Sequence, residues 1–213
     1  LAREPVQKAT VPRRSMIEYL ASLPDLLRRD LNFRRFLVAR LLMALGGMGM
    51  GFVTVSALHR WSVPDSTAGL YTIAFLGGQT VGNIGFGFLA DRFGHKLSLE
   101  LAIFAAVLGF AVALAAPAAD WYFLAFVLLG IAASAGFGSA LLVVMEFCEP
   151  QRRPTYVGIT STSVGLVGIV APLLGATLAT ASYEWLFAAC VLVNILALIL
   201  MRWWVREPRW KAA

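Results

Sequence analysis

The chain has 213 residues, of which 59% are hydrophobic and 14% are charged, with a formal net charge of +6. Soluble domains carry about 25% charged residues, so this composition excludes an ordinary soluble domain and indicates a membrane protein. A nucleic-acid-binding role is not expected, because no soluble stretch combines basic residues with interleaved aromatic ones.

Residues 1–35 are predicted to be a cytoplasmic linker. Two prolines and four basic residues make the first 14 residues an extended segment. Leucines and other apolar residues then recur at helical spacing from Ser15 to Leu31. This pattern predicts a short amphipathic helix in the membrane interface, because its leucine face needs cover. A solvated linker helix is the alternative.

Six apolar segments follow, and each is long enough to cross a bilayer, which takes about 20 residues. We therefore expect an all-α membrane protein with a six-helix transmembrane bundle over 36–205 and a cytoplasmic tail at 206–213. The predicted spans are 36–58, 67–88, 97–116, 121–145, 156–178 and 185–205.

Basic residues alternate between the connections, and this alternation predicts the topology. The segments before span 1, after spans 2 and 4 and after span 6 are rich in Arg and Lys. The other connections contain only Arg60, together with Asp65, Asp120 and Glu184. Both termini are therefore expected in the cytoplasm, with the protein a multi-pass component of the inner membrane of a prokaryote-like cell.

The glycine content of the predicted spans repeats after every three spans. Spans 1, 2, 4 and 5 are glycine-rich, whereas spans 3 and 6 share a single glycine, Gly109. The pattern predicts two three-helix repeats, and an odd number of helices inverts the second relative to the first. Small residues let membrane helices approach closely, so spans 1, 2, 4 and 5 are expected to pack and move, and spans 3 and 6 to face lipid.

The connection between spans 2 and 3 reads Gly87-Phe-Leu-Ala-Asp-Arg-Phe-Gly-His-Lys96. This G-x-L-A-D-R-x-G-x-K motif resembles the cytoplasmic loop signature of the major facilitator superfamily of secondary transporters. The six spans, the loop from Glu146 to Gly158, the Ala171–Gly175 segment and the terminal Arg-Glu-Pro are similar to the C-terminal half of such a transporter. An echo of Arg-Glu-Pro at residues 3–5 suggests that a further half precedes this one.

The resemblance implies secondary active transport of a small molecule by alternating access. The expected partners are the substrate, the lipid bilayer and an N-terminal six-helix half or a second copy of this unit. The alternative is a half-size membrane scaffold or homodimeric carrier unit without enzymatic activity of its own.

The loop motif is expected to act as a cytoplasmic gate. Gly87 and Gly94 would permit a tight turn, and Asp91 would accept hydrogen bonds from the start of span 5. Arg92 and Lys96 would pair with Glu146 or Glu149. The alternative is that these charges only anchor the loop and set the topology. The predicted gating residues are Gly87, Asp91, Arg92, Gly94, Lys96, Glu146 and Arg152.

Polar residues at mid-span are the candidates for the substrate cavity. Gln79 and Asn83 share one helix face at i and i+4, although each has helix–helix hydrogen bonding as an equally good explanation. Asn194 is expected to make such a bond. Arg40 and Glu100, one turn inside the membrane, are explained by snorkelling. The predicted cavity residues are Gln79, Asn83, Phe52, Ser134 and Phe137. For Ser134 a bond to its own helix backbone is the favoured alternative, and for the two phenylalanines it is packing.

An intramembrane serine protease is the other class considered. It needs a Ser–His pair, but the two histidines, His59 and His95, are predicted at opposite membrane faces and out of reach of Ser139. No enzymatic activity, cofactor or metal is expected, and the spacing of Cys148 and Cys190 fits no metal site.

Overall fold

The computed structural model describes residues 28–136 and 138–207, and every regular element in these ranges is helical. The predicted interfacial helix before Leu31 lies almost entirely outside the described residues. Six helical segments are long and apolar enough to cross a membrane, as the sequence predicts: Leu31–Trp61, Asp65–Phe93, His95–Ala115, Trp121–Glu146, Pro150–Ala181 and Tyr183–Trp204.

Two of the six segments are interrupted, so the helices outnumber the spans. In chain order the elements are α2 (Leu31–Gly46), the 3₁₀ turn η1 (Gly47–Gly49), α3 (Met50–Trp61), α4 (Asp65–Phe93), α5 (His95–Ala115), α6 (Trp121–Ser134), α7 (Gly138–Glu146), the 3₁₀ turn η2 (Pro150–Arg152), α8 (Arg153–Ala181), α9 (Tyr183–Ile199) and the π turn η3 (Leu200–Trp204).

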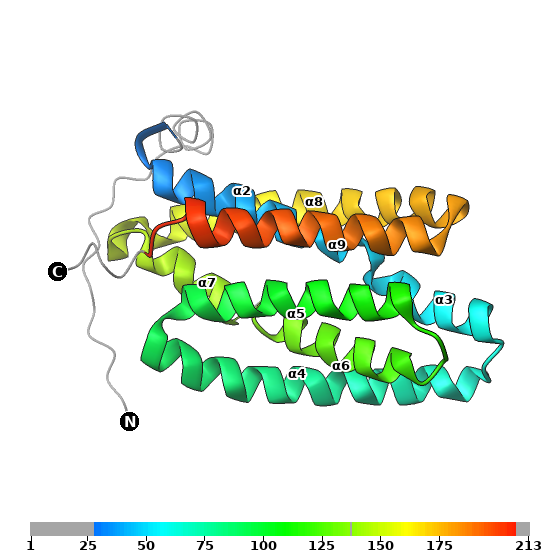
Figure 1. Cartoon of the computed structure of the whole chain (residues 1–213). Helices are drawn as coiled ribbons and strands as arrows, with labels where there is room; N and C mark the ends of the chain where they lie inside the picture. Colours follow the sequence, from blue (N-terminus) through cyan, green and yellow to red (C-terminus); the bar gives the residue numbers. More distant parts are fainter. Residues whose placement is uncertain (1–27, 137, 208–213) are drawn as a thin grey trace, which may run out of the picture.

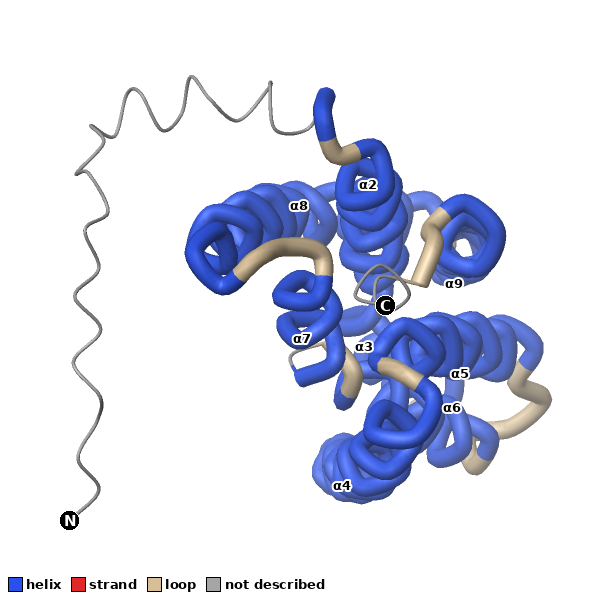
Figure 2. The backbone as a smooth tube through the Cα atoms, turned by 90° about the vertical axis from the view of Figure 1, so that its left-hand side faces the viewer, coloured by secondary structure: helices blue, strands red, loops and turns tan. Residues whose placement is uncertain are grey.

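The helices form two layers whose axes lie roughly along one line, with consecutive spans antiparallel (Figure 1). One layer contains α2, α8 and α9, the other contains α4, α5 and α6, and α5 packs against α9 across the layers. Both ends of the described chain lie at one end of the bundle, which we call the terminal end (Figure 2). The other end, with the α3–α4, α5–α6 and α8–α9 connections, is called the opposite end.

Each end has its own apolar core. Phe33, Phe36 and Leu99 are fully buried near the terminal end. Tyr71, Tyr122 and Phe187 form the second core, toward the opposite end. There Tyr71 lies parallel to the ring of Phe126 with 4.9 Å between ring centres. Aromatic and branched side chains fill these cores together with many alanines, while glycine controls how closely the helices approach.

The exposure of the helices differs from the sequence prediction in one respect. In the most apolar stretch of α5, 56% of the residues are buried, against 22% in α4 and 11% in the segment containing α8. Uniform apolar composition does not distinguish a lipid-facing helix from a central one, and α5 is central in this unit because it packs on α6 and α9.

The connection at 87–96 is also tighter than expected. α4 continues to Phe93 and α5 begins at His95, so Gly94 alone joins them. Its φ of 98° lies in a region that side chains make unfavourable, which is why glycine is needed here. Gly87 is not part of the turn, since it lies inside α4.

Candidate functional site

The first transmembrane segment is broken at its middle by glycines. α2 gives way to the η1 turn at Gly47, which changes the local hydrogen-bonding pattern. The Asn194 side chain on α9 donates to the carbonyl of Gly46 at 3.0 Å and to that of Cys190 at 2.8 Å. Because lipid offers no hydrogen bonds, a carbonyl at such a break needs a protein partner. The predicted helix–helix bond of Asn194 is confirmed.

In the fourth segment α6 and α7 are separated by a turn at Ala135 and Gly136, next to residue 137, which lies outside the described residues. Ser134 ends α6, and Gly138 begins α7. The guanidinium of Arg40 on α2 donates from Nη2 to the carbonyl of Gly136 at 2.9 Å, and its Nε is buried without a partner among the described residues. The expectation that Arg40 simply snorkels toward water is therefore wrong, because its side chain reaches across to the second break.

The two breaks occupy corresponding places in a repeated arrangement. Each three-helix unit starts with an interrupted segment, continues with an uninterrupted helix of 29 residues (α4 or α8) and ends with a third segment, α5 or α9 with η3. Interrupted helices in matching positions of inverted repeats are where transporters build their substrate and ion sites. Polar side chains and backbone carbonyls thus meet inside this bundle, at the two breaks.

The predicted cavity residues have different surroundings. Asn83 is exposed on α4, one turn from the half-buried Gln79. The Ser134 hydroxyl donates to the carbonyl of Ile131 in its own helix at 2.7 Å. Phe52 is half-buried beside Gly175, and Phe137 lies outside the described residues.

α4 and α8 both present an exposed face of apolar and small residues. Gly77 and Gly85 on α4, and Gly165 and Gly168 on α8, have open space where a Cβ atom would stand. The large exposed residues of these faces are Ile73, Leu76, Val81, Ile84 and Phe88 on α4, and Leu166, Ile169, Val170, Leu173 and Leu174 on α8. Open glycines beside exposed leucines are typical of a surface against which another helix can pack.

The predicted gate residues separate into two groups at the terminal end. Asp91 and Arg92 are exposed, and the Arg92 guanidinium lies 5.6 Å from the ring centre of Phe93. Lys96 is buried and pairs with Glu100 at 3.2 Å rather than with Glu146 or Glu149. Glu100 also pairs with Arg202 at 3.2 Å. Two cations thus balance its charge, and snorkelling toward water is not the reason for its position.

The second predicted gate segment follows α7. Glu146 is half-buried at the end of α7, and Arg152 is exposed in η2. Within the described residues Asp91 accepts no hydrogen bond from the first turn of α8. Cys148 lies between α7 and η2. Burial raises the pKa of its thiol, while the positive charge of Arg153 lowers it.

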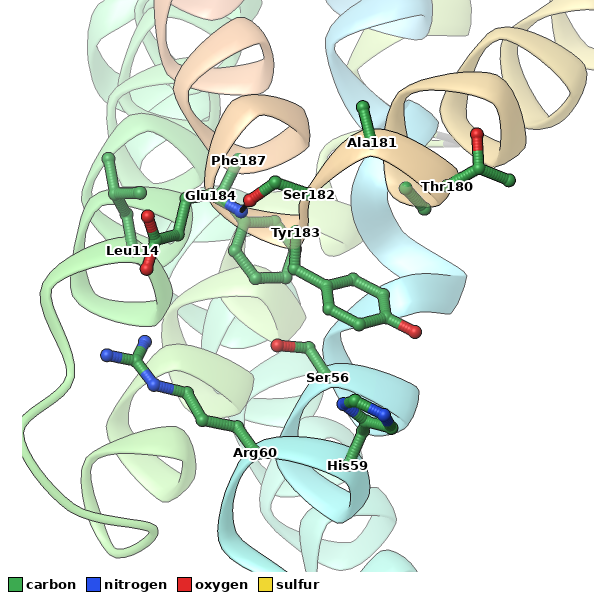
Figure 3. Close-up of a pocket in the computed structure, with 11 residues that line it drawn as sticks. Ser56, His59, Arg60, Leu114, Thr180, Ala181, Ser182, Tyr183, Glu184 and Phe187 are labelled. Carbon is green, nitrogen blue, oxygen red and sulfur yellow. Dashed lines mark hydrogen bonds between the residues drawn. The ribbon is translucent and has the colours of Figure 1, made fainter.

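A cavity of about 420 Å³ opens at the opposite end, where sequence reasoning placed no site. Figure 3 shows Arg60 of α3 and Glu184 of α9 on the same side of it, with their charged ends turned toward each other. Ser56 at its floor shares a buried hydrogen bond of 3.0 Å with Tyr122. The cavity is also lined by His59, Leu114, Ala179, Thr180, Ala181, Ser182, Tyr183 and Phe187. Its mixed charges select neither anions nor cations.

The chain resembles known membrane transporters. The model of the Major Facilitator Superfamily matches residues 36–212. The 4-hydroxybenzoate transporter of Pseudomonas putida is 30% identical over 84% of this chain and 41% of its own length. Solute carrier family 22 member 2 of Mus musculus is 30% identical over 71% of this chain and 26% of its own.

A third relative is the galactose-proton symporter of Escherichia coli (strain K12), which is 29% identical over 64% of this chain. The match covers 30% of that symporter. The chain therefore spans between about a quarter and two fifths of the length of these relatives.

Proposed function

Because this chain belongs to the major facilitator superfamily, we propose that it is a six-helix unit of a secondary active transporter of a small molecule. The observation that carries the proposal is the pair of broken segments, α2–α3 and α6–α7, at matching positions of two three-helix repeats. A break at mid-span lets a helix bend, and Asn194 and Arg40 hold the carbonyls at the two breaks.

The unit works together with a second six-helix unit, either an N-terminal half of the same transporter or a second copy. The exposed faces of α4 and α8 are the docking surface, because their open glycines accept a close helix and their leucines gain cover. Rocking of the two units about this surface would open the site alternately to each side of the membrane. A non-transporting scaffold would have no use for two broken spans.

The substrate path follows α4. Gln79 and Asn83 would present side-chain amides to the space between the units, together with the half-buried ring of Phe52. Asn83 is exposed in this unit, so its amide is open toward the side on which the second unit would dock.

The terminal end is proposed to face the cytoplasm. It carries the basic residues of α2, α8 and the α4–α5 turn, while Asp65, Asp120 and Glu184 lie at the opposite end. Asp91, Arg92, Glu146 and Arg152 would then latch the cytoplasmic side against the second unit. The exposure of Asp91 and Arg92 supports a partner outside this unit.

Transport by the whole protein in proteoliposomes tests the function. Galactose and 4-hydroxybenzoate, the compounds named for two relatives, are suitable first probes in a wider panel of small molecules. Asn83→Ala is expected to raise KM for the transported compound about fivefold to tenfold, the effect of losing one hydrogen bond. Thermal stability should not change, since Asn83 is exposed.

Thr80→Ala is the matched control. Thr80 is an exposed polar residue of α4 whose hydroxyl donates to the carbonyl of Leu76 in its own helix at 2.9 Å. Its loss should leave KM unchanged. If both variants kept the KM of the unmodified protein, Asn83 would not belong to the substrate path. Failure of every probe to be transported would count against the transport function.

A further inference from the structure

The π turn η3 turns one tryptophan away from the bundle. Val205 N–H donates to the carbonyl of Leu200 at 3.2 Å, five residues back, which is the pattern of a π turn. Met201 and Val205 are both buried in the core of the terminal end. Residues 202–204, which lie between them, therefore face away from the bundle, and Trp203 is 78% exposed.

An apolar stripe on α9 leads to this tryptophan. Leu192, Leu196 and Ile199 are exposed at spacings of three or four residues, so they share one face of the helix. Val38 is exposed on α2, which packs beside α9. The stripe has the length and chemistry to contact an acyl chain, and Trp203 marks the level at which the hydrocarbon ends.

Two arginines lie at the end of the stripe. The Arg35 guanidinium stands 5.5 Å from the ring centre of Trp204 and donates to the Trp204 carbonyl at 3.5 Å. Asn32 fixes the neighbouring backbone, because its side chain donates to the carbonyl of Arg206 at 2.9 Å and accepts from its N–H at 2.8 Å. The backbone of Arg206 is thus held beside the first turns of α2, which carry Arg35.

The acidic groups nearby are engaged elsewhere. Asp30 accepts from the N–H of Phe33 and from the hydroxyl of Tyr156. Glu100 is shared by Lys96 and Arg202, and the carboxylate of Glu207 is turned toward Gly94 at the start of α5. Within the described ranges neither Arg35 nor Arg206 forms an ion pair with a carboxylate, so both keep donors and charge for a ligand.

We propose that the surface where α2 and α9 meet at the terminal end binds one anionic phospholipid. Arg35 and Arg206 hold its phosphate, Trp203 lies at its glycerol backbone, and the stripe of Leu192, Leu196 and Ile199 contacts an acyl chain. Guanidinium groups suit a phosphate because they offer several donors in a planar fork. A free phosphate would satisfy only the arginines and leave the apolar stripe unused, which is why the ligand is assigned as a lipid.

Native mass spectrometry of the chain in mild detergent tests the proposal, with phosphatidylglycerol and phosphatidylcholine of identical acyl chains added in turn. One phosphatidylglycerol should remain bound at concentrations where phosphatidylcholine does not. Arg35→Gln combined with Arg206→Gln should weaken phosphatidylglycerol binding about tenfold or more, since each basic residue contributes to headgroup attraction.

Arg92→Gln is the matched control. Arg92 is also exposed at the terminal end and lies 5.6 Å from an aromatic ring centre, but it belongs to α4 and not to the surface where α2 and α9 meet. Its loss should leave lipid binding unchanged. Equal binding of the two lipids, or an equal loss in the control, would mean that only general surface charge attracts lipid and would overturn the site.

Two further measurements keep the result decisive. Arg206→Gln alone removes a side chain that has no partner in the described chain, so this variant should keep its melting temperature. Weaker lipid binding by it then supports the site, even if the double variant unfolds. Unchanged binding by it would contradict the role of Arg206. Inorganic phosphate is the last probe, and the proposal expects it not to displace the lipid. Displacement at equal concentration would make this an anion site and not a lipid site.

Discussion

At the scale of the residue, the two breaks are each closed by one polar side chain from another segment. Asn194 serves the carbonyl of Gly46 and Arg40 serves that of Gly136. The bond of Asn194 was predictable because a buried amide in a membrane helix needs a partner. The partner of Arg40 was not, because Gly136 is 96 residues away in the chain and only the packing of the spans brings the two together.

Arg40→Ala should therefore destabilise the bundle, by about 1–3 kcal/mol for a carbonyl left without its charged donor. The thermal midpoint in detergent, followed by the loss of the monodisperse peak on size exclusion, measures this. Arg34→Ala is the control, since Arg34 is an exposed arginine on the same helix. Equal midpoints for the two variants would show that the bond between Arg40 and Gly136 contributes no stability.

At the scale of the element, glycine has two opposite uses within single helices. A Cβ atom at Gly130 on α6 would collide with the backbone of Phe75 and Gln79, and one at Gly78 on α4 would collide with that of Val127. These glycines let α4 and α6 pack with their backbones in contact. Gly77, next to Gly78, faces open space. Composition shows that α4 is rich in glycine, but only the packing tells which of its glycines are covered.

Gly130→Ala is expected to lower the thermal midpoint, because separating two packed backbones costs about 1–3 kcal/mol. Gly69→Ala, at another α4 glycine with open space around it, should keep or raise it, because alanine favours a helix over glycine by about 1 kcal/mol. The two variants make the same chemical change with opposite expected signs, and thermal melting of each in detergent compares them. A loss of the same size in both would mean that α4 and α6 are not packed through Gly130.

At the scale of the whole molecule, the proposed orientation places the terminal end in the cytoplasm. The bias of basic residues toward this end is the reason. Arg152→Cys and Glu184→Cys, each in a background with alanine at both native cysteines, place single thiols at exposed positions at the two ends of the bundle.

In intact cells a membrane-impermeant maleimide should label the cysteine at 184, and it should reach the one at 152 only after permeabilisation. Labelling of position 152 in intact cells would reverse the orientation. The two positions serve as controls for each other, because both are exposed in the structure.

The sequence by itself determined that this is a six-span membrane protein of two glycine-patterned repeats and indicated its family, because bilayer thickness and the cost of buried charge act on each segment separately. It also placed glycine at the tight turn before His95. Only the tertiary structure decided which helices are central and which glycines are covered. It also decided that Lys96 pairs with Glu100 and that Arg40 reaches the α6–α7 break. These features depend on contacts between segments distant in the chain, whose pairing no local pattern of apolar residues records.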